Sequence, residues 1–382
     1  VSDHAVAIES YDRPLSAAAV VTLRNSIGAA RVVGLGESRH DTREQTLVKG
    51  LLVRHLVEHL GFRAVILEES FTHAATLDRY VTTGEGDLRE HLNGLAGWYL
   101  WDTEEMLGVV EWIRQYNERR AADDPVRIFG MDVTAPASAV ASVLDALEVA
   151  DVDGRFDARS LGLDLLEGDF WATTWERYAE LSDERRTDLA ANYDVLVETV
   201  QAEKERLVAV SSEHDYERTR WLAEIGRAGN AMFSAAGREQ GGAVRERAMA
   251  RTVTWILDRE IAGERAILWA HNLHVAKSTF RMPGLMEGEL EPMAVRLSAE
   301  LGDDYVAIGA AFGEGTYGPD LPPGERRFEV PSADVMDGAL ARVGLPSFLV
   351  DVRAAAGDPV AGPWLGQERE WVAQDARSVL VP

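Results

Sequence analysis

Short apolar runs alternate with amphipathic helical segments along much of the chain, and this alternation limits the fold more than any other feature of the sequence. The first run, residues 30–36, is β-branched and enters a loop at Gly36, which is typical of a buried parallel strand. Later runs of this kind occupy residues 63–70, 126–133, 265–272, 304–315 and 347–353. Strands that alternate with helices predict an α/β fold with a mainly parallel central sheet flanked by helices.

The helical segments carry start and stop signals. Residues 43–59 place leucines on one face, and Gly61 follows at the position where a left-handed residue commonly ends a helix. Asp102 is the expected N-cap of a second helix, which runs to residue 117. A third helix is expected over residues 135–148.

Residues 161–260 are almost purely helical in pattern, densely charged and interspersed with aromatic side chains. We therefore expect a single domain over residues 1–382, with its α/β core at 1–150 and 262–382. Residues 151–261 then form a large helical insertion or cap, which provides one wall of a cleft. The segment 317–326 is a Pro/Gly loop, and the tail after Gly357 is expected to be irregular.

The composition excludes several classes of protein. The net charge is −25, from 39 Lys and Arg against 64 Asp and Glu, so nucleic acid and anionic membranes are poor partners. A neutral or cationic small-molecule substrate suits this charge. The chain contains no cysteine, which excludes a thiolate nucleophile and disulfides. No apolar run is long enough to span a bilayer, and residues 1–15 lack a signal-peptide pattern, so we expect a cytoplasmic location. We also expect a monomer or dimer.

Polar side chains follow the predicted strands at the points where they end. The first strand leads to Glu37, Arg39 and His40, and later strands lead to other polar groups: Glu68, Glu69, Asp132, His271, Asn272 and His274. The carboxyl ends of parallel strands meet at one edge of a sheet, where ligands bind. The sequence therefore predicts that His40, His271 and several carboxylates converge on one site, with His274 just beyond.

These residue types suit water attack on an ester. A histidine whose ring is oriented by a carboxylate acts as a general base near neutral pH, and Glu37 and Glu68 are candidates to orient His40. In an alternative arrangement, the two glutamates share a proton and one of them acts as the acid. His271 is the candidate to polarise the carbonyl or to protonate the leaving alkoxide.

Other sequence motifs offer alternatives to this site. The stretch GLGESR at 34–39 fails the dinucleotide-binding pattern at its last position, and no phosphate-binding loop motif occurs. Residues 36–40 resemble a nucleophile elbow with Ser38 as nucleophile, but His40 replaces the final glycine. A metal site built from Glu37, His40, Glu68, His271 and His274 is a further alternative. We expect neither a cofactor nor a resident metal.

The pattern as a whole resembles the erythromycin esterase family. The matching stretches are VVGLGESRHDTRE, LVEHLGFRAVILEES, WDTEEMLGVVEWIRQYN, VRIFGMDV, RERAMA, ILWAHNLHVAK and LGDDYVAIGAAFGEGTY, in the family's order from about residue 30 to residue 317. The resemblance implies that water opens a macrolide lactone without a covalent acyl-enzyme.

The resemblance also implies roles for individual residues. The family's general base falls on His40, its glutamates on Glu37 and Glu68, and its second histidine on His271. Lys49 stands where well-studied members have arginine, so the match there is less close. The family stretch R-D-x-x-M-A-x-N begins here at Arg245, with Glu246 in place of Asp and Thr252 in place of Asn.

Further side chains are expected to bind the substrate. Arg39 and Lys49 are candidates to contact the substrate or its developing anion. The other candidates lie on the same edge or in the aromatic run before residue 102: Glu69, Trp98, Tyr99, Trp101, Asp132, Asn272 and His274. The aromatics of the helical insertion are expected mainly to pack helix on helix, with cleft contact as the alternative: Trp171, Trp175, Trp221 and Phe233.

Three functions remain open from the sequence. The first is hydrolysis of a macrolactone or similar ester, with a cationic macrolide-like compound as a fitting substrate. The second is an enzyme of natural-product biosynthesis that uses the same His/Glu set for proton transfer, elimination or cyclisation. The third is a non-catalytic protein that binds a small molecule or a metal.

Overall fold

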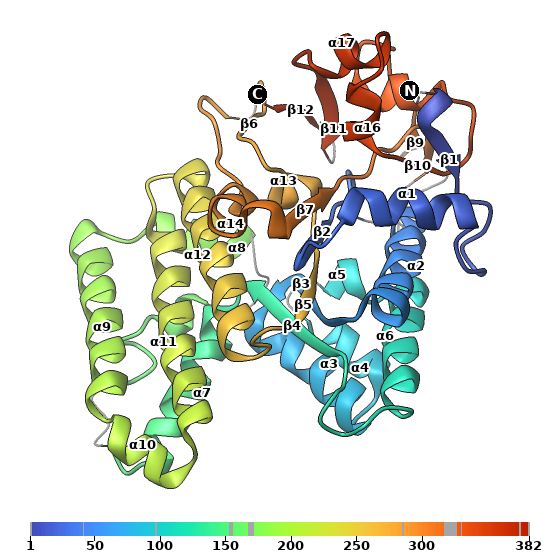
Figure 1. The fold of residues 1–382 in the computed structure, drawn as a ribbon. Helices are drawn as coiled ribbons and strands as arrows, with labels where there is room; N and C mark the ends of the chain where they lie inside the picture. Colours follow the sequence, from blue (N-terminus) through green and yellow to red (C-terminus); the bar gives the residue numbers. More distant parts are fainter. Residues whose placement is uncertain are drawn as a thin grey trace.

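A central sheet of five parallel strands forms the core of the protein (Figure 1). The computed structural model describes residues 2–40, 42–95, 98–152, 156–166, 172–284, 286–316, 327–329, 331–373 and 376–380. In the order in which they pair, the strands are β4 (Arg127–Asp132), β3 (Phe62–Ser70), β5 (Arg265–Trp269), β2 (Val32–Leu35) and β7 (Tyr305–Ile308). The prediction of a mainly parallel sheet flanked by helices is confirmed.

Both faces of the sheet are buried, which explains why its strands read as continuous apolar runs. Val33, in register with Ile267, faces a core formed with the first helices. These are α1 (Ala17–Ile27), α2 (Arg43–Leu60), α3 (Phe71–Thr83), α4 (Leu88–Asn93), α5 (Trp98–Trp101) and α6 (Glu104–Asn117). Val32 and Leu268 face the opposite core, which is completed by α12 (Arg238–Arg259) and α14 (Met293–Leu301).

A helical bundle lies beside the sheet (Figure 1). With α12, it contains α7 (Pro136–Val149), α8 (Ala172–Ala179), α9 (Asp183–Ala202), α10 (Lys204–Val210) and α11 (Glu213–Ser234), and the short turn η2 (Leu163–Leu165) lies between α7 and α8. Val140 and Val143 of α7 pack in one apolar cluster with Tyr193 and Leu196 of α9. The bundle therefore takes in α7 as well, ahead of the boundary expected at residue 151.

The C-terminal part departs from the sequence expectations. The run 347–353 does not join the central sheet; it gives β10 (Phe348–Val350), which pairs antiparallel with β1 (Ala5–Ala7). The tail after Gly357 was expected to be irregular, and that prediction is wrong. It contains α17 (Ala361–Leu365), β11 (Glu370–Ala373) and β12 (Ala376–Leu380), and β12 pairs with β6 (Phe280–Arg281). These pairings join segments far apart in the sequence, which local patterns do not reveal.

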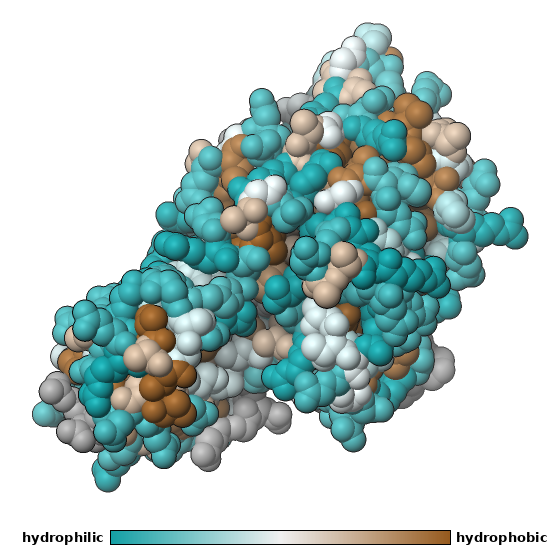
Figure 2. Space-filling view, turned by 60° about the horizontal axis from the view of Figure 1, so that its bottom comes forward, coloured by the Kyte–Doolittle hydropathy of each residue, from teal (hydrophilic) through white to brown (hydrophobic). Residues whose placement is uncertain are grey.

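The remaining elements are short. They are η1 (Ser2–His4), α13 (Asn272–Val275), η3 (Gly302–Asp304), β8 (Gly315–Thr316), β9 (Arg327–Phe328), α15 (Met336–Ala341) and α16 (Val352–Ala356). The predicted loop 317–326 lies outside the described residues. No helix in the described ranges has the length and apolar character needed to cross a membrane. On the face shown in Figure 2 the surface is mostly hydrophilic, with scattered apolar groups.

The predicted end of α2 at Gly61 is confirmed, whereas the predicted start of α6 is wrong by one residue. Gly61 ends α2 in the left-handed conformation, with φ 72°. Asp102 is not the N-cap of α6, because the side chain of Thr103 accepts the Met106 N–H at 3.1 Å. Asp102 instead forms an ion pair with Arg89 at 3.0 Å.

Gly130 offers a test of how tightly β4 packs against the end of β3. A Cβ at this position would press into the carbonyl oxygens of Glu69 and Ser70, which are backbone atoms that cannot turn away. We expect Gly130→Ala to lower the free energy of unfolding by about 1 to 3 kcal/mol, as overpacking does. Urea unfolding at constant slope measures the change.

Gly108 on α6 is the matched control, because a Cβ there would meet no atom within 4 Å. Gly108→Ala should raise the free energy of unfolding by about 0.5 to 1 kcal/mol, since alanine favours the helix. Equal stability of the two variants would contradict the tight contact between β4 and β3.

Candidate active site

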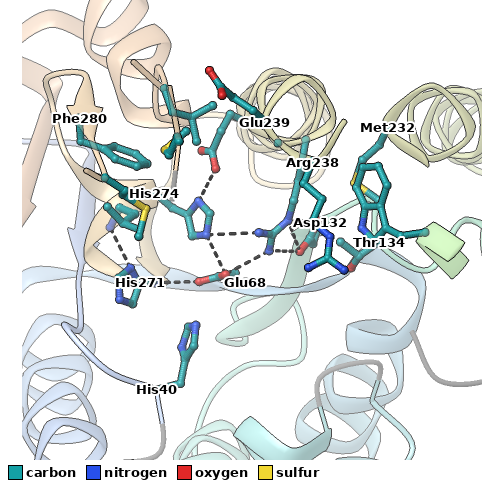
Figure 3. Close-up of a pocket in the computed structure, with 18 of the residues that line it drawn as sticks. His40, Glu68, Asp132, Thr134, Met232, Arg238, Glu239, His271, His274 and Phe280 are labelled. Atoms are coloured by element: carbon teal, nitrogen blue, oxygen red, sulfur yellow. Dashed lines mark hydrogen bonds and ion pairs between the residues drawn. The ribbon is translucent and has the colours of Figure 1, made fainter. Parts of the chain in front are cut away.

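The carboxyl ends of β2, β3, β4 and β5 open into a cleft of about 490 Å³ (Figure 3). One wall comes from the sheet edge, and the other from α8, α11, α12 and the segment 280–290. The polar lining side chains are His40, Glu68, Glu69, Asp132, Thr134, Arg238, Glu239, Arg245, Glu246, His271 and His274. The apolar ones are Leu100, Trp175, Met232, Leu273, Phe280, Met282, Met286 and Leu290. Its volume lies within the range of about 300 to 1,000 Å³ that is usual for small-molecule sites.

His40 follows β2 and is held by Glu37. Its Nδ1 lies 2.6 Å from Glu37 Oε1, so the Nδ1–H donates a hydrogen bond to the carboxylate. Nε2 is therefore unprotonated when the ring is neutral. Lys49 on α2 donates to the other oxygen of Glu37 at 2.7 Å and to the Ala270 carbonyl at 3.1 Å. Glu37 and Lys49 are both buried, whereas 20% of the His40 side chain remains exposed. A buried ion pair thus orients a histidine that reaches the cleft.

The pKa of Glu37 is shifted in the direction that favours this arrangement. Burial raises the pKa of Glu37, but the charge of Lys49 and the hydrogen bonds from His40 and Lys49 bring it down to about 2. Glu37 is therefore a carboxylate at neutral pH. A fixed negative charge beside Nδ1 stabilises the imidazolium that forms when Nε2 takes up a proton.

His271 follows β5, and its ring faces backbone groups on both sides. Nε2 donates to the Ser38 carbonyl at 3.0 Å, and Nδ1 accepts the Leu273 N–H at 3.1 Å as the N-cap of α13. Burial, and the nearby charge of His40, lower the pKa of His271 to about 3. The ring centroids of His271 and His40 lie 5.2 Å apart. His271 is therefore a neutral ring packed beside His40, with neither nitrogen available to donate a proton to a substrate.

A second charged network lies next to His271 in the cleft (Figure 3). His274 lies between two carboxylates, with Nε2 at 2.8 Å from Glu68 and Nδ1 at 2.6 Å from Glu246. Arg245 joins Glu68 at 3.1 Å to Asp132, which it approaches to 2.5 Å. Glu68 also accepts the backbone N–H of His271 at 2.8 Å. The network thus joins two cations (His274 and Arg245) and three carboxylates (Glu68, Asp132 and Glu246), which come from β3, β4, α12 and α13.

Two members of this network, Arg245 and Glu246, were not among the predicted site residues. Both lie on α12, within the sequence stretch that carries the family resemblance, and that stretch was the available signal. Burial lowers the pKa of His274, but the charges of Glu246 and Glu68 raise it to about 10. Burial raises the pKa of Glu68, but the charge and hydrogen bond of His274, together with the charges of His40 and Arg245, bring it well below the usual value for a glutamate. His274 is accordingly a cation and Glu68 an anion at neutral pH.

The family model for erythromycin esterase matches residues 57–377. The chain belongs to the erythromycin esterase family. It is therefore an ester hydrolase. Glu37, His40 and Lys49 precede the matched residues, so their assignment to the site rests on the geometry above.

Known proteins resemble the chain in sequence and in fold. Erythromycin esterase type II of Escherichia coli is 27% identical over 310 residues, which cover 75% of this chain and 70% of that protein. A solved structure from Bacillus cereus has a TM-score of 0.80 at 22% identity and covers 100% of this chain and 92% of its own. A solved erythromycin esterase mutant in its open conformation has a TM-score of 0.68 at 20% identity, over 96% and 91% of the two chains. The two structures share the fold.

The geometry separates the roles expected for the two glutamates. Glu37 orients His40, as predicted from the sequence, but no hydrogen bond joins Glu68 to His40, and both residues are described. Each glutamate has cationic partners of its own and a lowered pKa, so this geometry does not favour the alternative in which the two share a proton. Ser38 is also a poor nucleophile, because it is fully buried and its Oγ accepts the Gln45 amide at 3.2 Å.

The side chains predicted to bind substrate fall into two groups. Glu69, Asp132 and His274 line the cleft, whereas Arg39, Lys49 and Asn272 are buried and are not among its lining residues. Asn272 exchanges two hydrogen bonds with the backbone of Ala310, at 2.6 and 3.0 Å, and so has a structural role.

The aromatic residues divide in a similar way. Trp101 is buried in the core formed with the first helices, so it is not among the residues that line the cleft. Its burial could not be read from the sequence. Trp175 lines the cleft, and Trp221 stacks on Trp255 in the core. The side chains of Trp98 and Tyr99, and all of Trp171, lie outside the described residues.

The metal-site alternative finds no ligand set in the described part of the chain, where no group of three or more His, Cys, Asp or Glu residues is arranged to hold an ion. The ring nitrogens of His271 already bond backbone groups, and those of His274 contact carboxylates. His40 and Glu37 are paired with each other. The histidines proposed as ligands are therefore engaged with protein groups.

The contrasting histidines can be distinguished by nitrogen-15 NMR of the imidazole rings. At about pH 8, where an unperturbed histidine is neutral, His274 should remain doubly protonated, because its pKa is raised. At about pH 5, where an unperturbed histidine is charged, His271 should remain neutral with its proton on Nε2. Assignment by His274→Gln and His271→Asn identifies the signals. A neutral His274 at pH 8 would contradict the network between Glu68 and Glu246.

Proposed function

We propose that this protein hydrolyses a macrolactone or similar ester by direct attack of a water molecule that His40 activates. The single observation that carries the proposal is the 2.6 Å hydrogen bond from His40 Nδ1 to a buried, ionised Glu37. This bond directs the basic Nε2 away from Glu37, on a ring that lines the cleft. A general base held in this way contributes about 10² to 10⁴ in rate.

His40 alone can both remove the proton from water and deliver it to the leaving group. Nε2 takes a proton from water as the water oxygen bonds to the ester carbonyl carbon. The imidazolium then returns that proton to the leaving alkoxide as the carbon–oxygen bond breaks, which gives an acid and an alcohol. His271 has no part in proton transfer here, because both of its ring nitrogens bond to the backbone.

Lys49 and the second network support this cycle from opposite sides. Lys49 maintains the charge of Glu37 in a buried setting, where an unpaired carboxylate would take up a proton. In the second network, His274 and Arg245 hold Glu68 as an anion beside the neutral ring of His271. We propose that Glu68 orients the attacking water as a hydrogen-bond acceptor, while His40 removes its proton.

The lining of the cleft supports a large amphipathic substrate. Methionines, Trp175 and Phe280 form an apolar wall, which fits the carbon skeleton of a macrolactone. The charged lining side chains comprise five carboxylates, Arg238, Arg245 and protonated His274. This excess of negative charge, together with the net charge of −25, favours a cationic macrolide-like compound. The similarity to the erythromycin esterase of Escherichia coli points to the same class.

Mass spectrometry of erythromycin and a small macrolide panel incubated with the protein tests this proposal. We expect the mass of one water to be added to at least one macrolide. His40→Asn should remove the reaction, and Glu37→Gln should lower kcat by about 10² to 10⁴, because the amide keeps an acceptor for Nδ1–H but loses the charge.

Two further readouts decide between mechanisms. In ¹⁸O-labelled water the label should enter the acid product, and the intact protein should gain no acyl mass during turnover. An acyl adduct would disprove direct water attack. Full activity of His40→Asn would disprove the role of His40, and an unchanged panel with well-folded protein would disprove macrolide hydrolysis.

A further inference from the structure

Glu246 on α12 bonds two different parts of the cleft at once. Its Oε1 lies 2.6 Å from Nδ1 of His274, and its Oε2 accepts the backbone N–H of Met293 at 2.8 Å. Glu246, His274 and Met293 are all buried. Hydrogen bonds to a charged group are strong, and away from water they are stronger still. One side chain thus joins the charged network to the first residue of α14.

The bond to Met293 supplies a cap that α14 lacks. Pro292 precedes the helix and provides no side-chain cap. The first N–H groups of a helix have no partner within the helix, and a negative charge beside them is favourable. Glu246 meets both needs from a neighbouring helix, so it fixes the start of α14 relative to α12.

Fixing the start of α14 also fixes an apolar wall of the cleft. Leu290, three residues before Met293, exchanges two backbone hydrogen bonds with Phe280, at 3.1 and 3.0 Å. Phe280 and Leu290 both line the cleft, and we call this pair the apolar wall (Figure 3). A change in the length of the Glu246 side chain would therefore move the apolar wall relative to the charged network at the strand ends.

We propose that Glu246 is a positioning residue that determines substrate selectivity, because it sets the distance between the charged network and the apolar wall. A large lactone must contact the wall while its ester carbonyl lies at His40, so its correct placement depends on this distance. A small ester that reaches His40 without touching the wall does not depend on it. This inference rests on the proposed ester hydrolysis.

The length of the side chain is the property that matters. The family stretch that begins at Arg245 has aspartate in place of Glu246. Aspartate keeps the charge but is shorter by one methylene, which is about 1.5 Å of reach. A shorter carboxylate cannot bond both His274 and Met293 while α12 and α14 stay in place. Glutamate therefore gives this chain a wall position that aspartate would not give.

Two substitutions separate the two bonds of Glu246. Glu246→Asp keeps the charge, so it should retain the ion pair with His274 and lose the bond to Met293. Glu246→Gln keeps an acceptor for Met293 but removes the charge beside His274. The substrates are a macrolactone and a small ester, p-nitrophenyl acetate. We expect the ratio of their kcat/KM values to fall about three- to tenfold in Glu246→Asp and to stay within about twofold of the wild type in Glu246→Gln.

Glu300→Asp is the matched control. Glu300 on α14 accepts a hydrogen bond from Thr254 of α12 at 2.9 Å, so it joins the same two helices, but it is exposed and does not line the cleft. The ratio in this variant should equal that of the wild type. An unchanged ratio in Glu246→Asp, or an equal fall in Glu300→Asp, would overturn the inference.

NMR of the imidazole rings distinguishes positioning from a merely structural role. Glu246→Gln should lower the pKa of His274 by about 1 to 3, because one of its two carboxylate partners is lost, whereas Glu246→Asp should leave it raised. Urea unfolding verifies that each variant is folded. A fall in selectivity that follows the pKa of His274, with Glu246→Gln affected more than Glu246→Asp, would also overturn the inference.

A binding measurement separates failure of this inference from failure of the hydrolase proposal. In the His40→Asn protein a macrolactone stays intact, so its Kd can be measured by calorimetry with and without Glu246→Asp. Binding that is about three- to tenfold weaker with Glu246→Asp, and unchanged with Glu300→Asp, supports the inference even if the wild type hydrolyses no lactone. Equal Kd values, or no binding to the His40→Asn protein, overturn it.

Discussion

The buried ion pair between Glu37 and Lys49 is the interaction on which the candidate site depends. Both side chains are withdrawn from water, and leaving either one alone would cost about 3 to 5 kcal/mol, so the fold must bring β2 and α2 together in one arrangement. That arrangement fixes one oxygen of Glu37 on Lys49 and leaves the other for His40. The ion pair fixes the position of Glu37, and Glu37 in turn fixes the direction in which Nε2 of His40 points. Lysine serves this role with a single contact to the carboxylate, although it lacks the planar fork of arginine.

The second network repeats the same principle with more members. Glu68 lies between His274 and Arg245, and each of these cations has a second carboxylate of its own. The network ties α12 of the helical bundle to the ends of three strands, so the wall of the cleft and its floor share one set of charges. A cleft between two packed units would otherwise be free to widen. His271 contacts members of both networks, and both of its ring nitrogens bond to the backbone, so it adds no charge to either network.

Much of the fold followed from local patterns, and much of the site followed from the topology they imply. The strand at 63–70 could be predicted because a strand buried on both faces needs a continuous apolar run. The end of the helix at Gly61 could be predicted because a left-handed cap favours glycine. The convergence of Glu37, His40, Glu68 and His271 followed from the common direction of parallel strands. The partners of Glu68 did not, because Arg245 and Glu246 reach the site from a distant helix. Burial of Trp101 and Lys49, and the pairing of β10 with β1, likewise depend on tertiary contacts that no local period encodes.

The pairing of β12 with β6 places the end of the described chain in the architecture of the cleft. Phe280 lines the cleft, and its backbone neighbours across the sheet are Leu380 and, through the next residue, Val379. A residue about a hundred positions away along the chain therefore sets the position of one wall of the binding space. A substitution in β12 would therefore change which substrates fit the cleft, although β12 is far in sequence from the motif residues of the site.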